Sequence, residues 1–118
     1  EEKTVFILSS GEKFALQKRK AGGLLPNLWE FPNTSGYLTE EQSRPVLEDW
    51  GILVEEMLEL KPSKHIFSHI EWHMKGFFVT AANTDKSSSN FVWVTKEEIQ
   101  HQYSIPTAFK DFIKYILK

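Results

Sequence analysis

The chain has 118 residues, no cysteine and a formal net charge of −2. This length suits one domain with one hydrophobic core. The charge argues against a polybasic nucleic-acid arm or a membrane-surface patch, and the lack of cysteine excludes disulfides, thiol catalysis and iron–sulfur or zinc–thiolate ligation by this chain. No apolar run approaches the roughly 20 residues of a membrane-spanning helix. The chain starts at Glu1 without an initiator methionine, so we expect a piece of a longer protein.

The first third of the chain predicts short β-strands. Residues 4–9 are mostly apolar and include β-branched side chains, and residues 13–19 return after a turn at Gly11. This pattern predicts a β-hairpin. Residues 29–31 predict a third strand that Pro32 ends, because proline cannot donate to a sheet ladder.

A helix is predicted in residues 39–50, where the apolar side chains have helical spacing. Pro45 disfavours a helix interior, so we expect the helix to begin near Ser43 or Arg44. Gly51 is expected to end it.

Two further strands are predicted before residue 80. Residues 52–60 read as a strand with a register shift, and Lys61-Pro62 turns the chain. From Ile70 the pattern alternates, which is typical of a strand with two different faces. One face carries Ile70, Trp72, Met74 and Phe78.

The C-terminal part predicts one more strand and two helices. Residues 91–94 are apolar, and Thr95 with Glu98 forms the capping-box pattern of a helix start. The tail has an apolar stripe at helical spacing. Strands, a helix, strands and helices in that order predict an α+β fold, a mixed α/β arrangement around a sheet. The stripe consists of Phe109, Phe112, Ile113, Ile116 and Leu117.

Three segments together resemble a known family. They are residues 23–32 (Gly-Leu-Leu-Pro-Asn-Leu-Trp-Glu-Phe-Pro), residues 64–69 (Lys-His-Ile-Phe-Ser-His) and residues 105–109 (Ile-Pro-Thr-Ala-Phe). In this order and spacing they resemble the C-terminal domain of the A/G-specific adenine DNA glycosylases, the MutY family. The resemblance spans nearly the whole chain, and its most specific element is Phe-Ser-His. It implies a Nudix-like fold, with a central mixed or antiparallel sheet flanked by helices, over a single domain at residues 1–118.

The resemblance also implies a division of labour. In the family, an N-terminal helical domain that holds a 4Fe-4S cluster excises adenine, and the C-terminal domain reads the opposite base, 8-oxoguanine. This chain would be the reading domain, with no cofactor, no metal and no catalytic residue of its own. Its implied partner is double-stranded DNA with an 8-oxoguanine:adenine pair, held jointly with the catalytic domain. We expect a monomer in the bacterial cytoplasm, at the nucleoid when bound to DNA, with no membrane contact.

The Nudix hydrolase signature can be tested on these residues. It runs G-x5-E-x7-R-E-U-x-E-E-x-G-U, where U is a bulky aliphatic residue, and its glutamates bind metal ions that hold a diphosphate. Anchored on Gly51, the pattern matches Arg44 but replaces the next glutamate by Pro45. Glu48 and Asp49 remain, yet neighbours on a helix diverge by about 100°. We expect a solvated helix face and not a magnesium site.

Phe67, Ser68 and His69 are the candidate lesion-reading residues. 8-Oxoguanine carries a hydrogen at N7, where guanine has only an acceptor. A Ser68 hydroxyl could accept that hydrogen, Phe67 could wedge beside the base, and His69 could donate to a phosphate or support the loop. Taken without the resemblance, the same residues also suit a core aromatic, a turn serine and a surface histidine.

Other side chains are weaker candidates. Lys64 and the cluster Lys18, Arg19 and Lys20 could contact the DNA backbone, although a charged hairpin end explains the cluster equally well. Three histidines recur every four residues, but on a strand this spacing separates them by about 13 Å, too far for one zinc ion. They are His65, His69 and His73.

Two alternatives stay open from the sequence. One is an independent Nudix-type hydrolase of an oxidised nucleotide, which the proline at position 45 disfavours. The other is a protein-interaction domain on a Nudix scaffold, which burial of Phe67 and Ser68 would favour.

Overall fold

The computed structural model describes residues 1–19, 28–67, 69–82 and 91–117. Lys20 and Ser68, both singled out from the sequence, lie outside the described residues. The described elements are β1 (Glu2–Ser10), β2 (Lys13–Lys18), β3 (Trp29–Glu30), β4 (Asn33–Ser35), α1 (Glu40–Asp49), β5 (Val54–Glu59), β6 (Ser63–Phe67), β7 (Ile70–Ala81), β8 (Val92–Thr95), α2 (Lys96–His101), the 3₁₀ helix η1 (Thr107–Phe109) and α3 (Lys110–Ile113).

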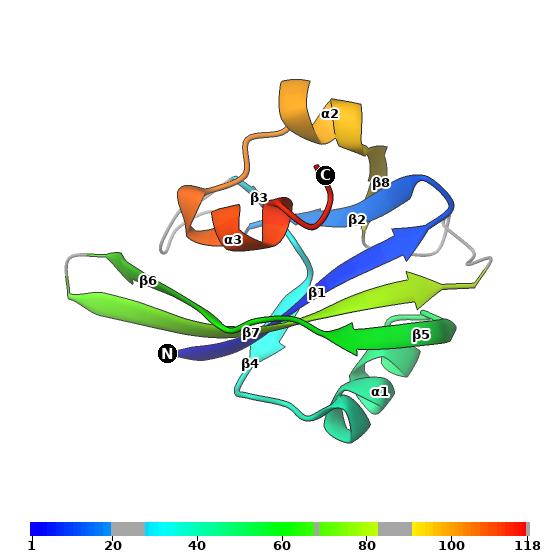
Figure 1. Cartoon of the computed structure of the whole chain (residues 1–118), viewed down its shortest axis with the longest axis horizontal. Coiled ribbons are helices and arrows are strands. Elements are labelled where there is room, and N and C mark those ends of the chain that lie inside the picture. Colours follow the sequence, from blue (N-terminus) through cyan, green and yellow to red (C-terminus); the bar gives the residue numbers. More distant parts are fainter. Residues whose placement is uncertain (20–27, 68, 83–90, 118) are drawn as a thin grey trace.

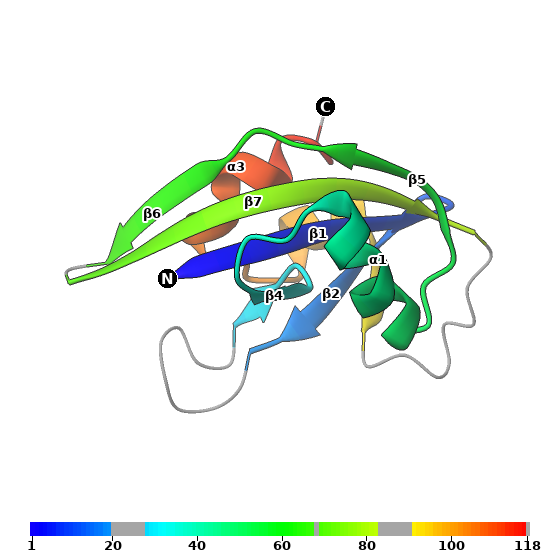
Figure 2. The ribbon, with the colours of Figure 1, turned by 90° about the horizontal axis from the view of Figure 1, so that it is seen from below.

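The sheet is mixed and built around β1 and β7 (Figures 1 and 2). These two strands pair in parallel, from Glu2 opposite His73 to Ser9 opposite Thr80, and every other strand pair among the described residues is antiparallel. The main path is β3-β2-β1-β7-β5, with β4 on β1, β6 on β7 and β8 on β2. The predicted hairpin of β1 and β2 is confirmed.

Both faces of β1 are buried, which explains its continuous apolar run. Val5 and Ile7 pack toward the C-terminal helices, and Phe6 and Leu8 pack with Leu47 of α1. Figure 1 shows α1 on one side of the β1–β7 pair and α3 on the other. The molecule is therefore layered as helix, sheet and helix, and the α+β prediction is confirmed. No helix in the described part of the chain is long and apolar enough to cross a membrane.

The alternation predicted for β7 is confirmed. Trp72, Met74 and Phe78 lie on the face of the C-terminal helices, and Phe77 and Val79 lie on the face of α1. The register shift predicted in β5 is also present, between Val54 and Glu56.

The predicted start of α1 is wrong. The helix begins at Glu40, because Thr39 accepts a hydrogen bond from the Gln42 backbone N–H and the Gln42 side chain accepts one from the Thr39 N–H. This capping box fixes the first turn of the helix ahead of Pro45. Pro45 has no backbone N–H, so the second turn lacks one backbone hydrogen bond. The predicted end is confirmed: Gly51 has φ +79°, and the Ile52 N–H donates to the Leu47 carbonyl at 2.9 Å, as in a Schellman motif.

The C-terminal helix is much shorter than predicted. Thr107–Phe109 form a 3₁₀ turn and α3 covers only Lys110–Ile113. The following turn makes bonds between residues three apart, such as the Ile116 N–H to the Ile113 carbonyl at 2.9 Å. These tight turns still bury the predicted apolar residues Phe109, Phe112 and Ile116.

Gly76 of β7 provides a test of how α3 sits on the sheet. A methyl group at this position would lie 2.5 Å from Cε1 of the buried Phe112 ring. We expect Gly76→Ala to lower the free energy of unfolding by about 1–3 kcal/mol, as overpacking does. Urea unfolding measures this change. The slope of the free energy of unfolding against urea concentration should be the same in the variant and in the unaltered chain.

The matched control is Phe112→Leu, which removes the ring that the methyl group meets. The double variant Gly76→Ala/Phe112→Leu should be more stable than the sum of the two single changes by more than about 0.5 kcal/mol. Additive effects would show that Gly76 does not support α3 in this way.

Candidate nucleic-acid interface

The β6–β7 hairpin extends from one end of the molecule. Its register runs from Ser63 opposite Met74 to Phe67 opposite Ile70, and the β1 pairing stops at His73, so the tip lies beyond the central sheet. Figures 1 and 2 both show the hairpin reaching past the helices. Residues 64–67 therefore lie in one strand of this hairpin, and His69 lies next to the start of the other.

The side of the hairpin that faces the C-terminal helices carries an aromatic cluster. The Phe67 ring is half-buried and lies 4.8 Å from the Trp72 ring and 4.5 Å from the His65 ring, between ring centroids. Trp72 is buried and lies 5.8 Å from Phe109 of η1. Phe67 thus contacts the core through Trp72 and lies near the hairpin tip.

Two cations lie over the same indole. Lys3 Nζ is 4.7 Å and Arg19 Cζ is 5.0 Å from the centroid of the Trp72 ring. Arg19 Nη1 donates to Glu30 Oε1 at 2.6 Å, and Gln17 Nε2 donates to Glu30 Oε2 at 2.8 Å. The side chains of Arg19 and Glu30 are only 15% and 9% exposed. Arg19 is therefore largely enclosed by the protein, and it is less open to a phosphate than Lys18 and Lys64, the other described candidates.

The tip itself is apolar and exposed. Ile66 is 56% exposed and Ile70 is 39% exposed, and His69 is exposed between them in the chain. The sequence predicts Ile70 on the same face as the buried Trp72 and Met74, but Ile70 is partly exposed because it lies at the hairpin end, and Ile66 is not distinguished from its neighbours. Their exposure follows from the hairpin reaching past β1, which leaves the tip without a covering layer.

The opposite side of the hairpin is mostly polar and carries the exposed Ile66 opposite Glu71. Lys64 is exposed, and its pairing partner His73 lies 3.0 Å from Glu71, between Nε2 and Oε1. Lys18 is exposed at the end of β2, opposite Trp29. Of the lysines predicted to contact the DNA backbone, the structure describes Lys64 and Lys18, and both are exposed.

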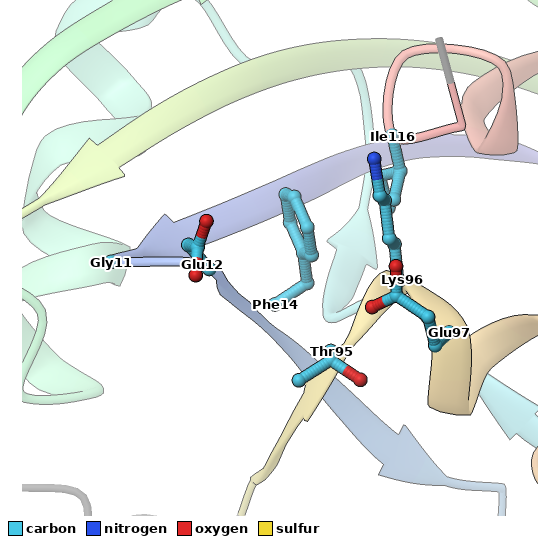
Figure 3. Close-up of a pocket in the computed structure, with 7 residues that line it drawn as sticks. All are labelled: Gly11, Glu12, Phe14, Thr95, Lys96, Glu97 and Ile116. Atoms are coloured by element: carbon cyan, nitrogen blue, oxygen red, sulfur yellow. The ribbon is translucent and has the colours of Figure 1, made fainter.

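A groove of about 320 Å³ lies between the hairpin and η1. All three segments that carry the family resemblance reach it: Leu28 from the first, His65 and Phe67 from the second, and Pro106, Thr107 and Ala108 from the third. A larger cavity of about 420 Å³ (Figure 3) contains none of the predicted site residues. It is lined by Gly11, Glu12, Phe14, Thr95, Lys96, Glu97 and Ile116.

The helix that carries the Nudix signature has no metal-binding face in the described chain. Its buried side chains are Ser43 and Leu47, while Glu48 and Asp49 are exposed. Glu40 is held by Arg44 at 2.8 Å. Within the described ranges no three His, Asp or Glu side chains are grouped so that they could hold a metal ion.

Comparison with known proteins identifies the family. The NUDIX domain model matches residues 4–115, and the chain belongs to this family. An adenine DNA glycosylase of Schizosaccharomyces pombe is 26% identical over 105 residues, which cover 79% of this chain and 23% of that protein. The chain thus spans about a quarter of that relative.

Solved structures share the fold. The C-terminal domain of mouse MUTYH, solved in complex with human PCNA, has a TM-score of 0.77 and 20% identity, over 98% of this chain and 86% of that one. The MutT protein of Bacillus halodurans has a TM-score of 0.68 and 20% identity, over 98% and 81%. The resemblance to adenine DNA glycosylases and the Nudix-like fold are therefore both confirmed.

Proposed function

We propose that this chain is the 8-oxoguanine-recognition domain of an adenine DNA glycosylase that removes adenine from 8-oxoguanine:adenine pairs. The observation that carries the proposal is the sequence match to an adenine DNA glycosylase over 79% of the chain. The hairpin with Phe67 at its end adds a surface suited to a base pair, since it reaches past the rest of the sheet.

The chemistry of the lesion defines what the hairpin must do. Oxidation gives N7 a hydrogen and C8 a carbonyl oxygen, so a reader must offer an acceptor at N7 where guanine would need a donor. The Ser68 hydroxyl can accept this hydrogen and still donate elsewhere. One good base contact of this kind is worth about 1–3 kcal/mol of discrimination.

The apolar tip supports a wedge beside the lesion. Proteins that unstack DNA insert apolar side chains between base steps. Phe67 is held by Trp72 and His65, and its strand partner Ile70 is an exposed apolar side chain on the same side of the hairpin. Ile66 is exposed on the other side. We infer that the tip meets the base step and that His69 contacts a phosphate there.

DNA would be held jointly with the catalytic domain. The net charge of −2 gives this chain little general attraction for DNA. Lys64 and Lys18 are exposed and can each contribute one phosphate contact. Arg19 is a weaker candidate, because Glu30 already binds its guanidinium.

Nudix hydrolysis of a nucleotide is the alternative, and the fold neighbours give it weight, since they include a MutT protein. The carboxylates of α1 argue against it. Pro45 stands in place of one ligand, Glu48 and Asp49 diverge into solvent, and Glu40 is paired with Arg44. A protein-interaction role gains no support from Phe67, which is half-buried and not buried.

Replacing Ser68 tests the lesion-reading role. In the full-length glycosylase, Ser68→Ala should narrow the preference for 8-oxoguanine:adenine over guanine:adenine by roughly five- to a hundredfold, the worth of one base contact. Adding Phe67→Ala should deepen the loss, because both side chains meet the same base. Single-turnover adenine release from the two duplexes measures the preference. If the double variant discriminates as well as the unaltered protein, the hairpin does not read the lesion.

Incubation of the chain with Mg²⁺ and a panel of nucleoside triphosphates tests the alternative. We expect no pyrophosphate release above the uncatalysed background, because α1 lacks convergent carboxylates. A MutT protein under the same conditions is the positive control. Turnover at about 1 s⁻¹ or faster, an ordinary enzymatic rate, would assign the chain to the hydrolases.

A further inference from the structure

Glu30 lies at the start of a continuous set of contacts that ends at the hairpin tip. Its carboxylate is nearly buried and both oxygens are used, Oε1 by Arg19 Nη1 at 2.6 Å and Oε2 by Gln17 Nε2 at 2.8 Å. A carboxylate that accepts from two fixed donors has one orientation. Glu30 is therefore a fixed anchor for Arg19.

Arg19 in turn lies against Trp72. The guanidinium carbon is 5.0 Å from the centroid of the indole, within the range of a cation–π contact. The Trp72 Nε1–H is buried without a hydrogen-bond partner among the described residues. Because no described hydrogen bond holds the indole, its orientation is set by packing in the core and by its ring contacts, which include the cations Arg19 and Lys3 and the Phe109 ring.

Trp72 supports Phe67. Their ring centroids are 4.8 Å apart at an interplanar angle of 68°, an edge-to-face contact. His65, the strand partner of Trp72, meets the same Phe67 ring at 4.5 Å. The contacts thus run from Glu30 through Arg19 and Trp72 to Phe67, and they cross from β3 and the end of β2 to the hairpin.

We propose that Glu30 is a positioning residue for lesion recognition, which holds Phe67 in place through Arg19 and Trp72. This inference rests on the proposed function of the hairpin. Without the negative charge, the nearly buried Arg19 loses this ion pair and has reason to turn toward solvent. Trp72 then loses one of its two cations, and Phe67 gains freedom that it must give up again when it meets a base pair.

The test uses Glu30→Gln in the full-length glycosylase. Glutamine keeps the shape but has one acceptor oxygen for two donors. We expect the preference for 8-oxoguanine:adenine over guanine:adenine to fall by about threefold to tenfold, less than the loss of a whole base contact. The change should lie in the DNA concentration needed for half-maximal rate, with the rate of adenine release at saturation unchanged. Glu30→Asp, which keeps the charge, should restore most of the preference.

The matched control is Glu40→Gln. It removes the charge from another Arg–Glu pair, that of Arg44 at 2.8 Å, which is half-exposed on α1. This variant should keep the full preference. A purely structural role for Glu30 would lower the active fraction equally for both duplexes and leave their ratio unchanged.

A double-mutant cycle with Phe67→Ala separates the possible failures. If Glu30 acts through Phe67, Glu30→Gln should have little further effect once Phe67 is alanine. Additive effects of the two changes would overturn the positioning role and leave the proposed function standing. The same conclusion would follow if a folded Glu30→Gln protein kept its preference while Phe67→Ala lost it. An unchanged preference in Phe67→Ala would also overturn the positioning role, and the Ser68→Ala/Phe67→Ala variant then decides whether the hairpin reads the lesion.

Arg19→Lys covers the case in which Glu30→Gln fails to fold. Lysine keeps the positive charge but lacks the planar fork that binds a carboxylate and stacks on an indole. We expect a smaller loss of preference in the same direction. A full preference in Arg19→Lys, with Phe67→Ala impaired, would again overturn the inference.

Discussion

The parallel pairing of β1 and β7 is the constraint on which the rest of the structure depends. The two strands run side by side from Glu2 and His73 to Ser9 and Thr80, and both of their faces are covered, by α1 on one side and the C-terminal helices on the other. β7 starts before this pairing does, at Ile70. Its first residues pair with β6, and on the β1 side Glu1 reaches them, through a bond from its amino group to the Glu71 carbonyl at 2.7 Å. In the described chain the β6–β7 hairpin therefore extends past the β1 ladder.

This arrangement supports the proposal that a Nudix-like scaffold serves recognition in this chain. The signature helix α1 still packs Leu47 against Phe6 and Phe77, so its structural task is intact. Its carboxylates point outward and Pro45 occupies a ligand position. The nearly buried ion pair of Arg19 and Glu30 adjoins Trp72, which lies on the opposite face of the sheet from α1.

Much of the fold could be predicted from the periodicity of apolar residues. The elements that differ from the prediction do so for physical reasons. α1 starts earlier than Pro45 alone predicts, because the Thr39–Gln42 capping box, a local signal in the sequence, fixes the first turn ahead of the proline. β4 could not be found, since its polar residues form a strand only by pairing with β1. For the candidate site, the sequence marks Phe67 but not the pairing of Arg19 with Glu30, which depends on the register of β2 and β3. From the sequence alone Lys18 and Arg19 look like a solvated basic cluster. Only the strand register shows that Glu30 lies close enough to pair with Arg19.

The central claim is that this chain makes adenine removal depend on the opposite base. Its most direct test compares the full-length glycosylase with the same protein lacking this domain, residues 1–118 in this numbering. The measurement is single-turnover adenine release from 8-oxoguanine:adenine and guanine:adenine duplexes. The account predicts that the preference for the lesion pair falls by roughly tenfold or more without the domain, the worth of one or more base contacts, while adenine is still released from guanine:adenine at saturating enzyme. An unchanged preference after the deletion would contradict it, because the lesion would then be read by the remaining part of the protein.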